Sequence, residues 1–137
     1  MNVQMNEFLS SLTEFFAFFA VAAVLTIVFT LIYWRVTKHD EFKLIKEKST
    51  AAAIAFSGSL IGFALPLVSV MVNSNGIIEV VLWGVVAMIV QIVVYFFVRW
   101  PMPRISERIE ENEIAAGIWL GTASLVGGML NAASMTT

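Results

Sequence analysis

Four long stretches of this sequence contain no charged side chain, and each has the length of a membrane-spanning helix. They cover residues 15–34, 50–72, 80–98 and 114–135. A helix needs about 20 mostly apolar residues to cross the ~30 Å hydrocarbon core of a bilayer. The chain is 59% hydrophobic and 13% charged, whereas a soluble domain carries about 25% charged residues. The sequence therefore predicts an all-α membrane protein, with four transmembrane helices in a single membrane domain over residues 1–137.

The basic residues predict the orientation of these helices. All eight Lys and Arg side chains fall within 35–48 and 99–108. Short loops that are rich in Lys and Arg stay in the cytoplasm, so both termini are expected to be periplasmic. Residues 1–14 have no basic residue, unlike the start of a cleaved signal peptide, so the first stretch is expected to be a retained helix. Aromatic residues near the helix ends are expected to anchor the protein at the interface: Tyr33, Trp34, Trp83, Tyr95 and Trp100.

A shift of 64 residues places the second half of the sequence on the first without a gap. Arg35 then falls on Arg99 and Glu47 falls on Glu111. Each half is a helix–loop–helix unit with an even number of crossings, so both units insert in the same orientation. The inverted repeats of many transporters have opposite orientations. The sequence thus predicts two tandem parallel helical hairpins, namely repeat 1 over 12–72 and repeat 2 over 77–135.

The second and fourth stretches are rich in small residues, which the first and third lack. Their small and polar residues recur at spacings of three or four and share one helix face: Gly58, Gly62, Pro66, Gly117, Gly121, Ser124, Gly128 and Asn131. Lipid gives little hydrophobic drive for helix association, so helices in a bilayer depend on close backbone approach and interhelical hydrogen bonds. We expect the second and fourth helices to form an inner pair, flanked by the bulkier first and third.

These eight residues allow two interpretations, helix packing or the wall of a conduit. In the conduit interpretation a path or hinge is lined by polar side chains: Ser57, Ser59, Ser69, Thr122, Ser124 and Asn131. Packing is the favoured interpretation. Gln91 and Asn131 are the amides inside predicted spans, and such an amide is expected to bond to a neighbouring helix.

Chemistry that needs clustered ionisable groups has little support in the sequence. The chain has no Cys and one His, His39, so we expect no metal site, no cofactor and no catalytic set. No charged residue lies near mid-bilayer, where proton relays and ion-coupled pumps have one. The net charge of −2 argues against a nucleic-acid partner. The run 39–41 could suggest a general base or a metal cluster, but no nucleophile or second His accompanies it, so we expect neither there. The acidic run 110–113 is expected to be the solvated face of a helix over 106–113, with Ser106 as its N-cap.

Several runs of the sequence resemble the YjfL-like family of bacterial inner-membrane proteins. They are Ala55-Phe-Ser-Gly-Ser-Leu-Ile-Gly62, Ala115-Ala-Gly117 through Gly127-Gly128, and Asn131-Ala-Ala-Ser-Met-Thr136, with the turn Pro101-Met-Pro103. The resemblance covers the whole chain. It implies tandem two-helix domains of unknown function in the bacterial inner membrane, and it implies no catalytic or binding residues. Such proteins are often encoded beside envelope-stress components of the phage-shock type and peptide-ligase-like enzymes, which implies an association but no mechanism.

These features predict a multi-pass inner-membrane protein without enzymatic activity, acting as a scaffold or partner component. The link to envelope stress comes from the resemblance alone. The expected partners are the lipid bilayer, further copies of the chain and other membrane proteins. The alternative is an oligomeric channel or small-solute conduit lined by Ser, Thr and Asn. One copy has too few helices to enclose a pore, so this alternative requires several copies.

Overall fold

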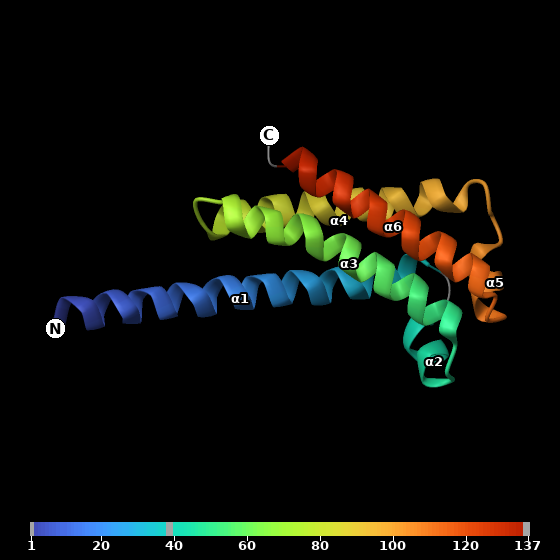
Figure 1. Ribbon diagram of the computed structural model, residues 1–137, viewed down its shortest axis with the longest axis horizontal. Coiled ribbons are helices and arrows are strands. Elements are labelled where there is room, and N and C mark those ends of the chain that lie inside the picture. Colours follow the sequence, from blue (N-terminus) through green and yellow to red (C-terminus); the bar gives the residue numbers. More distant parts are fainter. Residues whose placement is uncertain (1, 38–39, 136–137) are drawn as a thin grey trace.

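The computed structural model describes residues 2–37 and 40–135, which form six helices and no strand (Figure 1). They are α1 Asn2–Val36, α2 Glu41–Lys46, α3 Thr50–Asn73, α4 Ile77–Arg99, α5 Ile105–Glu110 and α6 Ile114–Met135. Within this part of the chain, α1, α3, α4 and α6 are long and apolar enough to cross a membrane. The prediction of an all-helical chain with four candidate spans is confirmed. His39 lies outside the described residues.

α1 is longer than the sequence analysis predicted. It begins at Asn2 instead of near Phe15 and has 35 residues, a length of about 52 Å at 1.5 Å per residue. Figure 1 shows its N-terminal part reaching beyond the ends of the other helices. No Gly or Pro interrupts residues 2–36, and the Thr13 hydroxyl donates to the carbonyl of Leu9 at 2.9 Å. Nothing in the local sequence stops the helix, so residues 2–14, which precede the predicted span, are part of it.

α3 and α6 form the centre of the bundle. They run in the same direction, opposite to α1 and α4 (Figure 1). We compare the most apolar 18-residue stretch of each long helix. The buried share of these residues is 44% in α3 and 39% in α6, against 11% in α1 and 28% in α4. α4 packs against both central helices, while α1 packs against α4 and α3. The prediction of an inner pair flanked by bulkier helices is confirmed.

The two short helices lie at one end of the molecule and end in the same way. Figure 1 places α2 and α5 at the end opposite the N- and C-termini. Each short helix is followed by a left-handed residue, Lys48 with φ 67° and Asn112 with φ 58°. In both turns the next amide donates at 2.9 Å to the carbonyl five residues earlier, which is the bond of a Schellman ending. Lys48 and Asn112 are 64 residues apart, as are the first residues of α3 and α6.

Two local predictions are wrong. Ser106 does not cap a helix over 106–113, because α5 begins after Arg104 and the left-handed Asn112 separates it from α6. Tyr33 and Tyr95 are not interfacial anchors. Both are 0% exposed, and their rings meet edge to face inside the bundle at 6.0 Å between centroids.

Candidate functional site

The predicted glycines lie where α3 and α6 touch backbone to backbone. A Cβ added to Gly58 would collide with the backbone of Gly121, and one added to Gly128 would collide with the backbone of Gly62. A Cβ on Gly117 would likewise meet the backbone of α3. Larger residues at these positions would push the helices apart. We call this contact the α3–α6 seam, and it depends on the absence of side chains.

Pro66 removes one helical hydrogen bond next to the seam. Because proline has no N–H, the carbonyl of Gly62, four residues earlier, receives no helical hydrogen bond from it. That carbonyl oxygen lies against the backbone of Gly128. Contacts between a carbonyl and a Cα–H recur at helix–helix interfaces as weak hydrogen bonds. Pro66 is itself fully buried, and α3 continues through it to Asn73.

Gln91 of α4 joins both helices of the seam. Its Nε2 donates to the carbonyl of Ser124 at 3.0 Å and to the carbonyl of Ser59 at 3.3 Å. Gln91 is 1% exposed, and a Cβ added to Gly62 would lie 2.5 Å from its Nε2. The Oε1 atom has no hydrogen-bond partner among the described residues. Gln91 was expected to bond to a neighbouring helix, but only the structure identifies its partners and places it at the seam.

Tyr33 ties α1 to the same region. Its hydroxyl accepts a hydrogen bond of 2.8 Å from the hydroxyl of Ser59. One turn earlier in α1, Phe29 stacks on Phe63 of α3 with ring centroids 4.5 Å apart. No sequence signal marks Tyr33 as a site residue, because its place at the end of an apolar stretch is typical of an interfacial tyrosine.

The polar residues proposed for a conduit do not lie together. Ser59 and Ser124 are buried, with 0% and 1% of their surface exposed. Ser57 and Thr122 are exposed and line a shallow groove of about 370 Å³ on the outer side of the seam. Asn131 is 8% exposed, and its Nδ2 has no hydrogen-bond partner among the described residues. The structure thus divides this set between the interior and the outer surface.

Asn112 caps the first turn of α3. Its Oδ1 accepts hydrogen bonds from the backbone N–H of Ala51 at 3.0 Å and from the hydroxyl of Ser49 at 3.3 Å. The Ser49 hydroxyl in turn accepts from the N–H of Ala52 at 3.2 Å. The first N–H groups of a helix have no partner within it, so a residue from the second half of the chain satisfies the start of a helix in the first half.

The acidic run before α6 contains an ion pair. The guanidinium of Arg108 donates two hydrogen bonds to the carboxylate of Glu113, from Nε at 2.8 Å and from Nη2. These bonds and the charge of Arg108 lower the pKa of Glu113, against a smaller opposing effect of burial. Glu113 is therefore paired, whereas we expected it on a solvated face. In the described ranges, no three His, Cys, Asp or Glu side chains lie close enough to hold a metal ion.

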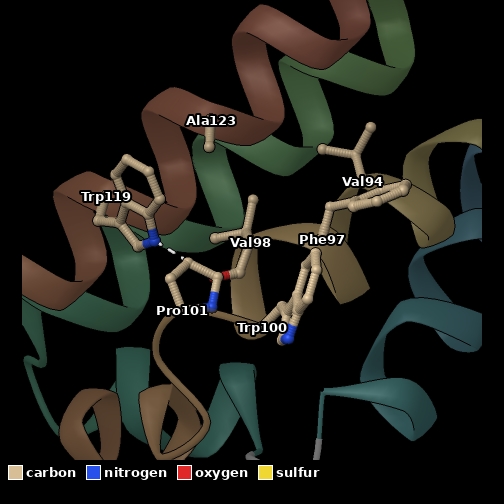
Figure 2. A pocket seen from close by; sticks show the side chains of 7 residues that line it. All are labelled: Val94, Phe97, Val98, Trp100, Pro101, Trp119 and Ala123. Carbon is tan, nitrogen blue, oxygen red and sulfur yellow. Dashed lines mark hydrogen bonds between the residues drawn. The ribbon is translucent and has the colours of Figure 1, made fainter.

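An apolar hollow of about 520 Å³ lies between α4, α6 and the loop after α4. Figure 2 shows its lining residues, Val94, Phe97, Val98, Trp100, Pro101, Trp119 and Ala123. The indole N–H of Trp119 donates to the carbonyl of Val98 at 3.4 Å, which holds this ring at the wall of the hollow. Trp100 is 80% exposed. The hollow offers apolar contact to a side chain from outside the chain.

Known proteins similar to this chain are membrane proteins of unassigned function. Residues 7–135 match the family described as "Domain of Unknown Function (DUF350)". The chain is 44% identical over 128 residues to the UPF0719 inner membrane protein YjfL of Escherichia coli strain K12, covering 93% of this chain and 97% of that protein. It is 26% identical over 110 residues to the UPF0719 transmembrane protein YshE of Bacillus subtilis strain 168, covering 79% and 82%. No solved structure matches it.

The family match spans both central helices and the loops at the α2 and α5 end. The resemblance that the sequence indicated is confirmed. The similar proteins are described as inner-membrane or transmembrane proteins, in agreement with four helices long and apolar enough to span a bilayer in residues 2–37 and 40–135. The chain therefore belongs to the UPF0719 family, with its Domain of Unknown Function DUF350, and is a multi-pass protein of the bacterial inner membrane.

Proposed function

We propose that this protein is a non-enzymatic scaffold of the inner membrane, which holds further copies of itself or other membrane proteins. The closure of the α3–α6 seam carries the proposal. Gln91, Ser59 and Tyr33 direct their hydrogen bonds to groups of the same chain, and the glycines bring the two backbones together. Such a bundle is closely packed inside and apolar outside, which suits a protein that supports others.

The proposal includes the arrangement of the chain as two tandem parallel hairpins, 12–72 and 77–135, with both termini in the periplasm. The equivalent turns at Lys48 and Asn112 support the repeat. All eight basic residues lie within 35–48 and 99–108, the segments that contain the short helices, and these helices lie opposite the chain ends (Figure 1). A topology reporter fused after Thr137 is expected to be active in the periplasm. Activity of that fusion in the cytoplasm alone would overturn the orientation.

Cysteine labelling tests the scaffold against a conduit, because the chain has no native cysteine. Under the proposal, Ser124→Cys stays protected from a membrane-impermeant thiol reagent in intact membranes. Asn75→Cys, in the exposed turn between α3 and α4, is the positive control and labels rapidly. Rapid labelling of Ser124→Cys in a folded variant would contradict the scaffold.

An oligomeric channel is the second candidate, and one observation favours it. Ser57 and Thr122 present hydroxyls in the groove outside the seam. Copies that met along this groove would line a path with these hydroxyls. In such a channel, Thr122→Cys labels rapidly with the same impermeant reagent. In the scaffold this groove faces lipid or a partner, and Thr122→Cys is protected.

A role in an envelope-stress system is also proposed, and its support is the family resemblance alone. Deletion of the protein is expected to change the output of a phage-shock-type reporter when the envelope is damaged. Restoration by the wild type but not by Gly128→Leu would connect that output to the α3–α6 seam. An unchanged reporter in the deletion strain would contradict this role.

A further inference from the structure

α1 and α4 hold equivalent places in the two proposed repeats, yet they bury opposite faces. Three large residues of α1 face the bundle: Leu25, Phe29 and Tyr33. The residues 64 positions later in α4 are exposed by 58%, 44% and 65%: Ile89, Val93 and Phe97. Conversely, α4 buries Gly84, Met88, Gln91 and Tyr95. Their equivalents in α1 are exposed: Ala20, Val24, Ile27 and Leu31.

This difference arises because α4 occupies a groove between α1 and α3. Leu25 of α1 lies 2.8 Å from the position of a Cβ on Gly84. Tyr95 meets Tyr33, and Gln91 bonds to the carbonyl of Ser59 on α3. Repeat 2 thus docks on repeat 1 by a heterologous contact, in which one surface meets a different surface of the partner unit.

The corresponding groove of repeat 2 lies between α4 and α6, and nothing in the described chain fills it. Phe97 is the equivalent of Tyr33, and Ala123 is the equivalent of Ser59. Both line the apolar hollow of Figure 2. On the same side, Gly127 faces Val94 of α4. A single chain therefore carries both halves of one contact, an open groove on repeat 2 and an open helix face on α1.

We propose that α1 of a second copy packs into the α4–α6 groove, as α4 packs into the α1–α3 groove of its own chain. The inference rests on the proposed repeat and on the self-association in the proposed function. Ala20 stands where α4 has Gly84, so the close approach is retained. Ile27 stands where α4 has Gln91, so no amide joins two copies and the contact relies on packing. Heterologous contacts build rings when the rotation closes and filaments when it does not.

Disulfide trapping in native membranes tests this contact. Ala20→Cys and Ile89→Cys correspond to the observed Gly84 and Leu25 pair. The two single variants, expressed together with different tags, are expected to form an oxidant-dependent dimer that carries both tags and disappears with reductant. Phe19→Cys replaces Ala20→Cys as the matched control, because it lies one residue away and about 100° around the helix. A second pair, Leu31→Cys with Phe97→Cys, repeats the test at the Tyr33–Tyr95 position.

The outcomes separate this inference from the proposed function. Dimers from the matched pairs, with none from the Phe19→Cys control, support the contact. A disulfide of Ala20→Cys with itself indicates an isologous contact and overturns the inference. If amine-reactive cross-linking finds oligomers but neither matched pair forms a disulfide, this contact is wrong while self-association stands. If every folded variant is monomeric in the membrane, with lipid in the groove, both this contact and self-association are wrong. Thermal unfolding of each variant confirms that it is folded.

Discussion

The side-chain amide of Gln91 on α4 donates to the backbone carbonyl of Ser124 on α6, with 3.0 Å between nitrogen and oxygen. The same nitrogen reaches the carbonyl of Ser59 on α3 at 3.3 Å. One amide therefore joins three helices within the α3–α6 seam. It fits there because Gly62 has no side chain to occupy its space.

Replacement of Gln91 is expected to weaken the bundle without removing a span. Gln91→Leu loses both interhelical bonds, and the free energy of unfolding falls by about 0.6–2 kcal/mol. Gln91→Glu is also expected to be less stable than the wild type at neutral pH, because a buried carboxyl either stays ionised with no donor or binds a proton and has one donor for two carbonyl oxygens. Unfolding in mixed micelles measures both effects, with the exposed Ile89→Leu as control. A Gln91→Glu variant as stable as the wild type would contradict this role.

The seam predicts that one added methyl group destabilises the protein at Gly128 and has little effect at Gly76. Gly128→Ala places a Cβ against the backbone of Gly62, and such overpacking costs about 1–3 kcal/mol. Gly76→Ala is the control, because a Cβ there meets nothing within 4 Å and its φ of 176° is extended backbone. Thermal unfolding compares the two variants. Equal midpoints would mean that α3 and α6 do not depend on backbone contact.

Asn112 is expected to stabilise the fold both through its side chain and through its left-handed backbone conformation. Asn112→Gly keeps the left-handed conformation but loses the bond to the N–H of Ala51, at a cost of about 1 kcal/mol, as for other helix caps. Asn112→Ala loses the same bond and, unlike Gly, keeps a Cβ at φ 58° without the polar side chain that helps Asn adopt it, which adds about 1–2 kcal/mol relative to Asn112→Gly. Lys48→Gly is the control. It places a glycine at the same left-handed conformation but removes no hydrogen bond to the start of a helix. Equilibrium unfolding is expected to rank Asn112→Ala below Asn112→Gly.

The pair of Arg108 and Glu113 predicts a pH dependence at the end that carries α2 and α5. The bonds from Arg108 lower the pKa of Glu113 in the folded protein, so the pair stabilises the fold above the ordinary carboxylate pKa of about 4.3. This contribution is lost as the pH falls through the lowered pKa, while Arg108, whose pKa is raised, stays charged. Glu113→Gln removes it at every pH.

Unfolding midpoints at several pH values test this prediction. The midpoint of the wild type is expected to exceed that of Glu113→Gln at neutral pH, and the difference is expected to shrink on acidification. Both side chains are partly exposed, so added salt is also expected to reduce the difference. A constant difference between the two proteins across this pH range would exclude the ion pair as its cause.

The sequence by itself determined the parts of this protein that depend on local chemistry. Four uncharged stretches of spanning length predicted four helices, because the backbone of a chain in lipid must satisfy its own hydrogen bonds. The spacing of Gly58, Gly62, Gly121 and Gly128 predicted which two helices approach closely, because only helices without side chains at the contact bring their backbones together. The matching turns at Lys48 and Asn112, which only the structure shows, are separated by the same 64 residues as the matching positions of the sequence.

The tertiary structure decided which face of each bulky helix is buried. α1 buries Phe29 and Tyr33, whereas the residues 64 positions later in α4, Val93 and Phe97, are exposed. No pattern marks this choice, because lipid and the interior of the bundle are both apolar and a spanning helix needs no polar face. For the same reason the burial of Tyr33 and the partners of Gln91 could not be read from the sequence. Both follow from the packing of α4 between α1 and α3. This packing depends on how the surfaces of helices that are distant in the chain fit together.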